Sequence, residues 1–152
     1  MASPYVDALK MLGRRELSEA QIRQRLTRRE HDPDAIDEAV ARLKEERAID
    51  DTRVAEAIAR TATAVRRRGR VRVRRQIEQA GIAPAIARRA VDDTFGALDE
   101  DALIDSALRK RLRGGEVITD DKAFARLYRY LIGQGFEQDR VMKALSAHRR
   151  RR

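Results

Sequence analysis

The sequence contains no cysteine and no tryptophan, and only six of its 152 residues are aromatic. Without cysteine, a disulfide framework, a thiolate metal site and a cysteine nucleophile are excluded. The two histidines, His31 and His148, lie far apart in the chain, so we expect no metal site built from imidazoles. No apolar run is long enough to cross a membrane, and the N-terminal residues do not resemble a signal peptide. We therefore expect a protein of the cytoplasm without membrane contact.

Long runs of β-branched residues with period-two alternation are also missing, so nothing in the sequence supports a β-sheet. Alanine, the strongest helix former, supplies 24 residues. Apolar residues make up 42% of the chain and recur at helical spacing, which is not typical of a disordered, highly charged chain. We predict an all-α fold.

Helix-start signals divide the first 50 residues into three helices. Ser3 and Asp32 each precede a proline, and Ser18 precedes Gln21 by three residues, as in a capping box. We expect the first helix to extend to about Arg15 and the next two to follow after short connections.

A recurring pattern predicts two further units of the same kind. Two apolar residues one turn apart are followed by glycine and another apolar residue, as Val73, Ile77, Gly81 and Ile82, and again as Leu127, Leu131, Gly135 and Phe136. Each glycine stands where a helix would end in the left-handed conformation. The first unit has Glu30 and His31 in this place, and we expect His31 to face solvent.

The repeat length of about fifty residues predicts three tandem three-helix units, at residues 1–50, 51–98 and 99–152. Tandem helical units of this kind form an elongated, curved array. The alternative is a nine-helix globular bundle, in which the similarities reflect only the common pattern of helix, turn and helix.

Positive charge exceeds negative charge, with 34 Lys and Arg against 25 Asp and Glu, and the excess is uneven. The three predicted units carry net charges of −1, +6 and +4. The cations gather in three places: Arg66, Arg67, Arg68, Arg70, Arg72, Arg74 and Arg75; Arg109, Lys110 and Arg111; and the terminal Arg149, Arg150, Arg151 and Arg152.

These basic clusters are candidate contacts for a polyanion. The guanidinium fork suits phosphate and carboxylate, and residues 66–75 include no acidic residue. The alternative is a solvated helix surface and a frayed tail. Because aromatic residues are few, recognition of the backbone of a nucleic acid or of an acidic surface is better supported than base stacking.

No motif for catalysis is present: the sequence has neither a phosphate-binding loop nor a dinucleotide fingerprint. Ser18 and Thr119 are interpreted as helix caps rather than nucleophiles. Three acidic pairs are interpreted as helix-start or surface residues rather than as magnesium ligands, namely Asp50 and Asp51, Asp92 and Asp93, and Asp120 and Asp121. We expect no catalytic residues, no cofactor and no enzymatic activity; the alternative is an undetected nuclease or NTPase.

An ordered set of segments resembles the RecX regulatory proteins across about residues 5–146. The set comprises Arg14 to Glu19 followed by Ile22 to Leu26, the acidic pair and arginine at Asp50, Asp51 and Arg53, the arginine–glycine stretch Arg68 to Ile77 followed by Gly81 and Ile82, and the closing segment from Tyr130 through Phe136 to Val141. No single segment is specific, but their order is.

The resemblance implies a bent protein of three tandem three-helix units that binds the RecA recombinase and its filament on single-stranded DNA. It also implies inhibition of recombinase, ATPase and co-protease activities, by occupation of the filament groove or by blocked extension. We expect a monomer, with direct contacts to single- or double-stranded DNA. The competing hypothesis is a basic helical-repeat protein that binds DNA without a recombinase partner.

Overall fold

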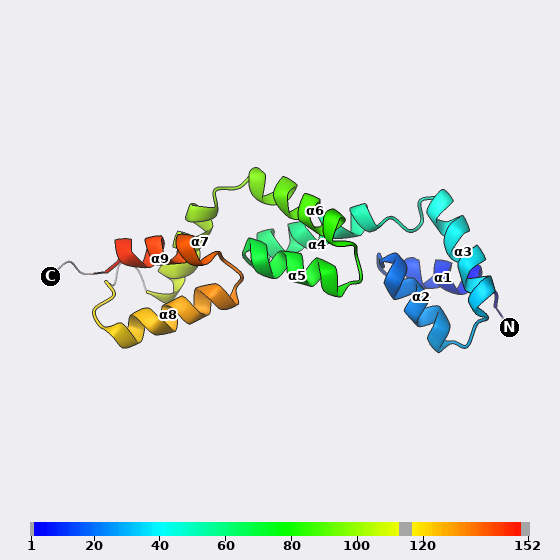
Figure 1. Ribbon diagram of the computed structural model, residues 1–152, viewed down its shortest axis with the longest axis horizontal. Coiled ribbons are helices and arrows are strands. Elements are labelled where there is room, and N and C mark those ends of the chain that lie inside the picture. Colours follow the sequence, from blue (N-terminus) through cyan, green and yellow to red (C-terminus); the bar gives the residue numbers. More distant parts are fainter. Residues whose placement is uncertain (1, 113–116, 150–152) are drawn as a thin grey trace. The chain divides into compact units, whose positions relative to one another are not determined.

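The computed structural model describes residues 2–112 and 117–149, and within them the chain forms nine α-helices. The only β-type pairing in these residues is a single bridge between Ile118 and Arg149. The helices are α1 (Pro4–Leu12), α2 (Glu19–Arg28), α3 (Pro33–Glu45), α4 (Asp51–Ala64), α5 (Arg70–Gln79), α6 (Pro84–Gly96), α7 (Glu100–Arg111), α8 (Asp121–Gly133) and α9 (Gln138–Ala147) (Figure 1). The all-α prediction is confirmed.

The N-terminal helix starts follow the predicted caps. The Oγ of Ser3 accepts from the backbone N–H of Val6 at 3.2 Å, and Ser18 and Gln21 form a complete capping box. The carboxylate of Asp32 accepts from the N–H of Ala35. These side chains satisfy backbone donors that have no partner within the helix.

Two helix boundaries differ from the expectation. Helix α1 ends at Leu12 rather than near Arg15, because Gly13, a weak helix former, closes the last turn through its N–H and the Leu9 carbonyl. Thr119 is not a cap: the carboxylate of Asp120 accepts from the N–H of Ala123 at 2.7 Å and begins α8.

A left-handed residue ends α2, α5 and α8 at equivalent positions. Gly81 and Gly135 have φ values of 80° and 99°, as the glycine pattern predicts, and Glu30 takes the same conformation with φ of 63°. The strain of a left-handed non-glycine residue is about 1–2 kcal/mol. The turn geometry therefore repeats even where the glycine does not.

The expectation that His31 faces solvent is wrong. After the left-handed Glu30, the chain turns back so that the N–H of His31 bonds to the Leu26 carbonyl. The imidazole Nε2 then lies 2.6 Å from the Asp7 carboxylate, and its side chain is only 13% exposed.

The chain divides into two compact units. The first unit contains Met1–Ile58 and Gln76–Ala90, and the second contains Ala59–Arg75 and Val91–Arg152. Helices α4, α5 and α6 contribute residues to both units. The division into three three-helix units with boundaries at residues 50 and 98 stays a proposal.

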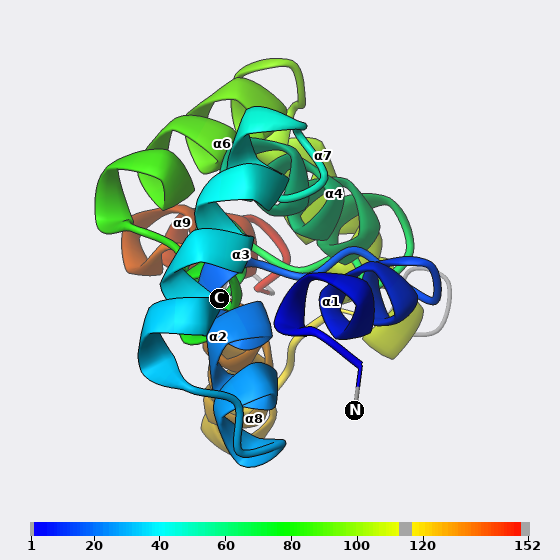
Figure 2. The ribbon, with the colours of Figure 1, turned by 90° about the vertical axis from the view of Figure 1, so that its right-hand side faces the viewer.

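Each unit has an apolar core in its terminal helices. Helices α1, α2 and α3 pack together (Figure 2). Their core contains Leu17, Ile22, Leu26 and Leu43, all at most 1% exposed. Helices α7, α8 and α9 pack around Ile104, Leu108, Leu131 and Leu145. Burying one such side chain contributes roughly 1.5–3 kcal/mol, so these cores hold the terminal helices in place.

The first unit also fixes the C-terminal end of α5. The hydroxyl of Ser18, which is fully buried, donates to the Ala80 carbonyl while its oxygen caps α2. A Cβ built on Gly81 would lie 2.4 Å from the Cβ of Ala20. Glycine at 81 therefore serves both the left-handed turn and a close approach to the start of α2.

Candidate nucleic-acid interface

All described residues of the three predicted basic clusters lie in the second compact unit. Arg66, Arg67 and Arg68 occupy the connection between α4 and α5, and Arg70, Arg72, Arg74 and Arg75 lie on α5. Arg109, Lys110 and Arg111 form the C-terminal end of α7, and Arg149 follows α9. Arg150, Arg151 and Arg152 lie outside the described residues.

The two compact units differ strongly in charge. The first has 13 Lys and Arg against 14 Asp and Glu, a net charge of −1. The second has 21 against 11, a net charge of +10. The net positive charge of the protein thus resides in the second unit.

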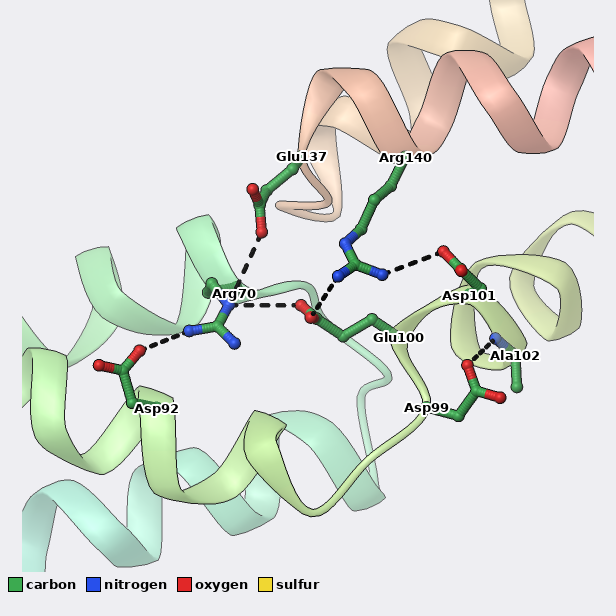
Figure 3. Close-up of polar contacts among 8 residues, drawn as sticks. All are labelled: Arg70, Asp92, Asp99, Glu100, Asp101, Ala102, Glu137 and Arg140. Atoms are coloured by element: carbon green, nitrogen blue, oxygen red, sulfur yellow. Dashed lines mark hydrogen bonds and ion pairs between the residues drawn. The ribbon is translucent and has the colours of Figure 1, made fainter.

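Arg70 is held by carboxylates from three segments of the second unit (Figure 3). Its Nη1 lies 2.5 Å from the Asp92 carboxylate, and its Nε lies 3.3 Å from Glu100 and 3.7 Å from Glu137. The guanidinium carbon lies 5.4 Å from the centre of the Phe95 ring. Burial alone would lower the pKa of Arg70, but the hydrogen bonds and charges of Glu100 and Asp92 raise it above its ordinary value.

Arg140 shares one of these carboxylates. It lies 3.4 Å from Glu100 and 3.1 Å from Asp101, while Asp99 caps α7 through the N–H of Ala102 (Figure 3). The start of α7 therefore ties α9, through Arg140, to the start of α5, through Arg70. We interpret Arg70 as a packing residue, since its charge is already balanced.

Two glycines bring the start of α5 against the turn between α8 and α9. The N–H of Gly69 donates to the Gln134 carbonyl at 2.7 Å, and the N–H of Val71 donates to the Gly135 carbonyl at 2.9 Å. A Cβ on Gly69 would lie 2.4 Å from the Gly135 backbone, and one on Gly135 would lie 2.2 Å from the Cβ of Arg72. Only glycine allows this approach at either position.

Arg72 and Arg67 make polar contacts within the second unit. Arg72 donates to the Gly133 carbonyl at 3.1 Å, and Arg67 donates to the hydroxyl of Ser106 on α7 at 3.2 Å. Burial lowers the pKa of Arg68, and the nearby charges of Arg72 and Arg66 lower it further. These arginines lie close enough to repel one another, which an anionic ligand would relieve.

Arg111 and Arg149 pack on aromatic rings. The guanidinium of Arg111 lies 3.8 Å from the centre of the Tyr130 ring, and that of Arg149 lies 5.1 Å from the Phe124 ring and pairs with Asp121. Such cation–π contacts stabilise by about 0.5–2 kcal/mol. These rings are therefore covered by arginine rather than open to a base.

A hollow on α7 is lined by two cations of one predicted cluster. It has a volume of about 350 Å³ and is lined by Ser106, Arg109 and Lys110, with Ala102 and Asp105. Ser106 lines this hollow together with Arg109 and Lys110, and its hydroxyl accepts a hydrogen bond from Arg67. A hydroxyl donor among cations is suited to a phosphate group.

The clusters therefore separate into two groups. The first group makes contacts within the second unit, to carboxylates, a carbonyl, a hydroxyl or rings: Arg67, Arg70, Arg72, Arg111 and Arg149. Arg111 and Arg149 of this group are also exposed, and Arg68, outside both groups, is half-buried. Arg66, Arg74, Arg75, Arg109 and Lys110 are exposed. Within residues 2–112 and 117–149, no ion pair involves Arg66, Arg75, Arg109 or Lys110. This second group is the candidate interface.

Sequence reasoning missed the partners of Arg70 and the role of Gly69. The carboxylates of Asp92, Glu100 and Glu137 lie 22 to 67 positions from Arg70 in the chain, so no local sequence pattern predicts these contacts. A lone glycine among seven arginines was the one available signal for a close backbone approach.

The described residues give no support for a metal site or a membrane span. They contain no cluster of three or more His, Asp or Glu side chains that could hold a metal ion. None of the helices in that part of the chain is both long and apolar enough to span a membrane.

Comparisons with known proteins converge on one family. The family description "RecX, first three-helix domain" matches residues 5–43. The regulatory protein RecX of Halorhodospira halophila is 32% identical over 141 residues, covering 92% of this chain and 84% of the relative. That of Syntrophotalea carbinolica is 29% identical over 146 residues, covering 95% of each chain.

Solved structures of RecX share the fold. The crystal structure of RecX from Lactobacillus salivarius has a TM-score of 0.81 at 18% identity, covering 95% of this chain and 93% of that one. A second crystal structure, of regulatory protein RecX, has a TM-score of 0.74 and covers 95% of this chain and 70% of its own. With the sequence identities, these likenesses show that the chain belongs to the RecX family of regulatory proteins.

Proposed function

We propose that this chain binds the RecA recombinase, above all its filament on single-stranded DNA, and inhibits recombinase, ATPase and co-protease activities. Membership of a family of regulatory proteins supports a regulatory role. The specific partner follows from the resemblance of the ordered segments to RecX proteins.

One observation supports an anionic partner most strongly: the second unit exposes cations that no carboxylate in the described residues balances. Arg75, Arg109 and Lys110 are exposed and form no ion pair in those ranges. A filament on DNA offers both phosphates and acidic side chains to such groups. Binding that releases counterions weakens steeply with salt.

Inhibition requires more than affinity. A ligand shifts an equilibrium only when it binds one state more tightly than the other. The protein must therefore prefer an altered or shortened filament over the active one, by lying in the groove or by blocking extension. The elongated, curved array expected from the tandem repeats would suit a filament groove.

The direct test compares naked single-stranded DNA with preformed recombinase filament at matched salt. The proposal expects tighter binding to the filament together with reduced ATP hydrolysis by the recombinase. Equal affinity for the two would instead support a DNA-binding repeat protein that acts alone. The hollow around Ser106, which is suited to phosphate without any protein partner, is the observation in favour of that alternative.

We also propose that the protein acts as a cytoplasmic monomer without enzymatic activity. Light scattering after gel filtration tests the monomer. Incubation of the purified protein with magnesium and either DNA or ATP tests the expected lack of enzymatic activity. Cleavage of DNA or hydrolysis of ATP that persists through purification would contradict that expectation.

A further inference from the structure

The first compact unit has almost no net charge, yet six of its 13 cations line one pocket. This pocket has a volume of about 580 Å³. Six of its eight lining residues are basic: Lys10, Arg14, Arg15, Arg25, Arg28 and Arg29. The sequence did not indicate these six residues, because the carboxylates elsewhere in the unit bring its net charge to about zero.

Local structure explains how these residues meet. Helix α1 ends at Leu12, so Lys10 on its last turn and Arg14 and Arg15 in the following turn come together. Arg25, Arg28 and Arg29 are spaced by three and four residues at the end of α2, which places them on one side of the helix. Helices α1 and α2 pack against each other, which brings the two sets to one pocket.

The one carboxylate in the lining, Asp7, is already engaged. It lies 2.6 Å from the Nε2 of His31 and 3.5 Å from Arg29, and its side chain is 12% exposed. The hydrogen bond to His31 lowers the pKa of Asp7, and the charge of Arg29 lowers it further. The charge of Lys10 also lowers the pKa of Asp7, so this single carboxylate faces His31, Arg29 and Lys10 and leaves Arg14, Arg15, Arg25 and Arg28 without an ion pair in the described residues.

The five lining cations other than Arg29 are exposed and form no ion pair within the described ranges: Lys10, Arg14, Arg15, Arg25 and Arg28. Elsewhere in the first unit, Arg23 pairs with Asp37, Lys44 with Glu19, and Arg53 with Glu16. Arg47, Arg88 and Arg89 are exposed without an ion pair in the described residues, but none of them lines the pocket. What distinguishes the pocket is that five cations without an ion pair in the described residues share one lining.

We propose that this pocket binds the backbone phosphates of a nucleic-acid strand. Five cations around one opening require several negative charges in close succession, which a phosphate backbone supplies. Four of them are arginines, whose forks bind phosphate oxygens in pairs. The inference does not rest on the proposed recombinase partner, because it concerns the first unit and its main test, binding of an oligonucleotide, needs no recombinase.

The residues that line the pocket favour a phosphate backbone over an acidic peptide or a stacked nucleobase. No aromatic side chain lines the pocket, so a nucleobase would have nothing to stack on. Met11 is the one apolar residue in the lining, which leaves little to anchor the side chains of an acidic peptide. Contacts to phosphates alone give affinity without sequence preference.

The test uses the full chain and a fluorescent 20-nucleotide oligothymidine. The pocket variant is Arg14→Gln with Arg28→Gln. The control is Arg88→Gln with Arg89→Gln, which removes two exposed arginines of the same unit outside the pocket lining. Circular dichroism melts check the fold of both variants.

We expect the pocket variant to bind the oligonucleotide about tenfold more weakly, with the slope of log affinity against log salt reduced by about 1.4, as for two lost phosphate contacts. The control should change less than twofold. Equal losses in both variants would overturn the proposal, since general charge would then explain the effect.

Two further binding experiments test the other possible ligands, a small polyphosphate and an acidic protein surface. If tripolyphosphate binds the wild type tightly while the pocket variant keeps its oligonucleotide affinity, the pocket is a site for a small polyphosphate and the proposal fails. If the pocket variant loses affinity only for a recombinase filament, the ligand is an acidic protein surface and the proposal also fails.

A footprint on the wild-type chain keeps the test independent of variant folding. Oligothymidine should protect Lys10 from acetylation several-fold, while Lys44, which pairs with Glu19 and does not line the pocket, stays reactive. Equal reactivity of Lys10 with and without the oligonucleotide would contradict the proposal.

Discussion

The two compact units treat their positive charges in opposite ways. The first has a total charge of −1, but five cations that line one pocket form no ion pair in the described residues. The second carries +10, yet surrounds Arg70 with three carboxylates from α6, α7 and the α8–α9 turn. Net charge therefore does not locate a binding surface. Our proposals for both units rest instead on the pairing and the grouping of individual cations.

The units also differ in how they hold α5. In the first unit, Ser18 donates to the Ala80 carbonyl just after α5, and the left-handed Gly81 packs closely against the start of α2. In the second unit, Gly69 at the start of α5 packs closely against Gly135. Several segments that carry the family resemblance thus serve packing. Arg53, for example, donates to the carbonyls of Arg47 and Ala48 and pairs with Glu16.

The largest expected effect concerns the glycine contact of the second unit. Gly135→Ala places a Cβ 2.2 Å from the Cβ of Arg72 at a residue with φ of 99°, so we expect the free energy of unfolding to fall by about 3 kcal/mol. Urea denaturation measures it. The control Gly133→Ala meets nothing within 4 Å and should be neutral or slightly stabilising. Similar losses in both would show that the close approach is not needed.

The second prediction separates packing arginines from binding arginines. Arg70→Gln leaves Glu100, only 10% exposed, with Arg140 as its remaining cation, and should reduce the free energy of unfolding by about 1–2 kcal/mol. Arg75→Gln should change it by less than about 0.5 kcal/mol, since Arg75 is exposed and has no ion pair in the described residues. Equal stability of the two variants would remove the distinction.

The third prediction concerns binding by the second unit. Arg75→Gln with Arg109→Gln should weaken binding to a recombinase filament about tenfold and reduce its salt dependence, because two anion contacts are lost. The matched pair Arg88→Gln with Arg89→Gln, in the first unit, should bind within twofold of the wild type. If Arg75→Gln with Arg109→Gln leaves the affinity as unchanged as the control does, the exposed arginines of the second unit are solvated surface.

The smallest effect is a pH dependence in the first unit. The pKa of Asp7 is lowered by its hydrogen bond to His31, so this carboxylate stabilises the folded state above the unfolded pKa of about 4. That stability is lost as the pH falls through the lowered pKa. Asp7→Asn should therefore be less stable at pH 7 and lose less stability between pH 5 and pH 2 than the wild type.

Glu38→Gln, an exposed change on α3, provides the control and should follow the wild-type pH profile. A wild-type profile that matches that of Asp7→Asn would contradict the role of the Asp7 and His31 pair. Thermal melts across this pH range measure all three chains.

Features set by neighbouring residues could be predicted from the sequence. The caps at Ser3, Ser18 and Asp32 involve residues three positions apart, and the left-handed Gly81 and Gly135 follow a local pattern. For the same reason the all-α class was predictable from periodicity and alanine content.

Features set by contacts distant in the chain could not be predicted. The partners of Arg70 and the approach of Gly69 to Gly135 depend on how helices pack. His31 was misplaced because Glu30 adopts a conformation that its residue type disfavours. The pocket of the first unit was missed because its cations come from two helices and its carboxylates mask them in any count of charge.

The central claim is that both units bind anions through the cations that lack carboxylate partners. A density map of this chain bound to a RecA filament on single-stranded DNA tests it most directly. We predict that Arg75 and Arg109 face phosphates or acidic side chains of the filament, and that nucleic-acid phosphates lie in the pocket containing Arg14 and Arg28. A map in which these four side chains point to solvent while other surfaces hold the filament would contradict the claim.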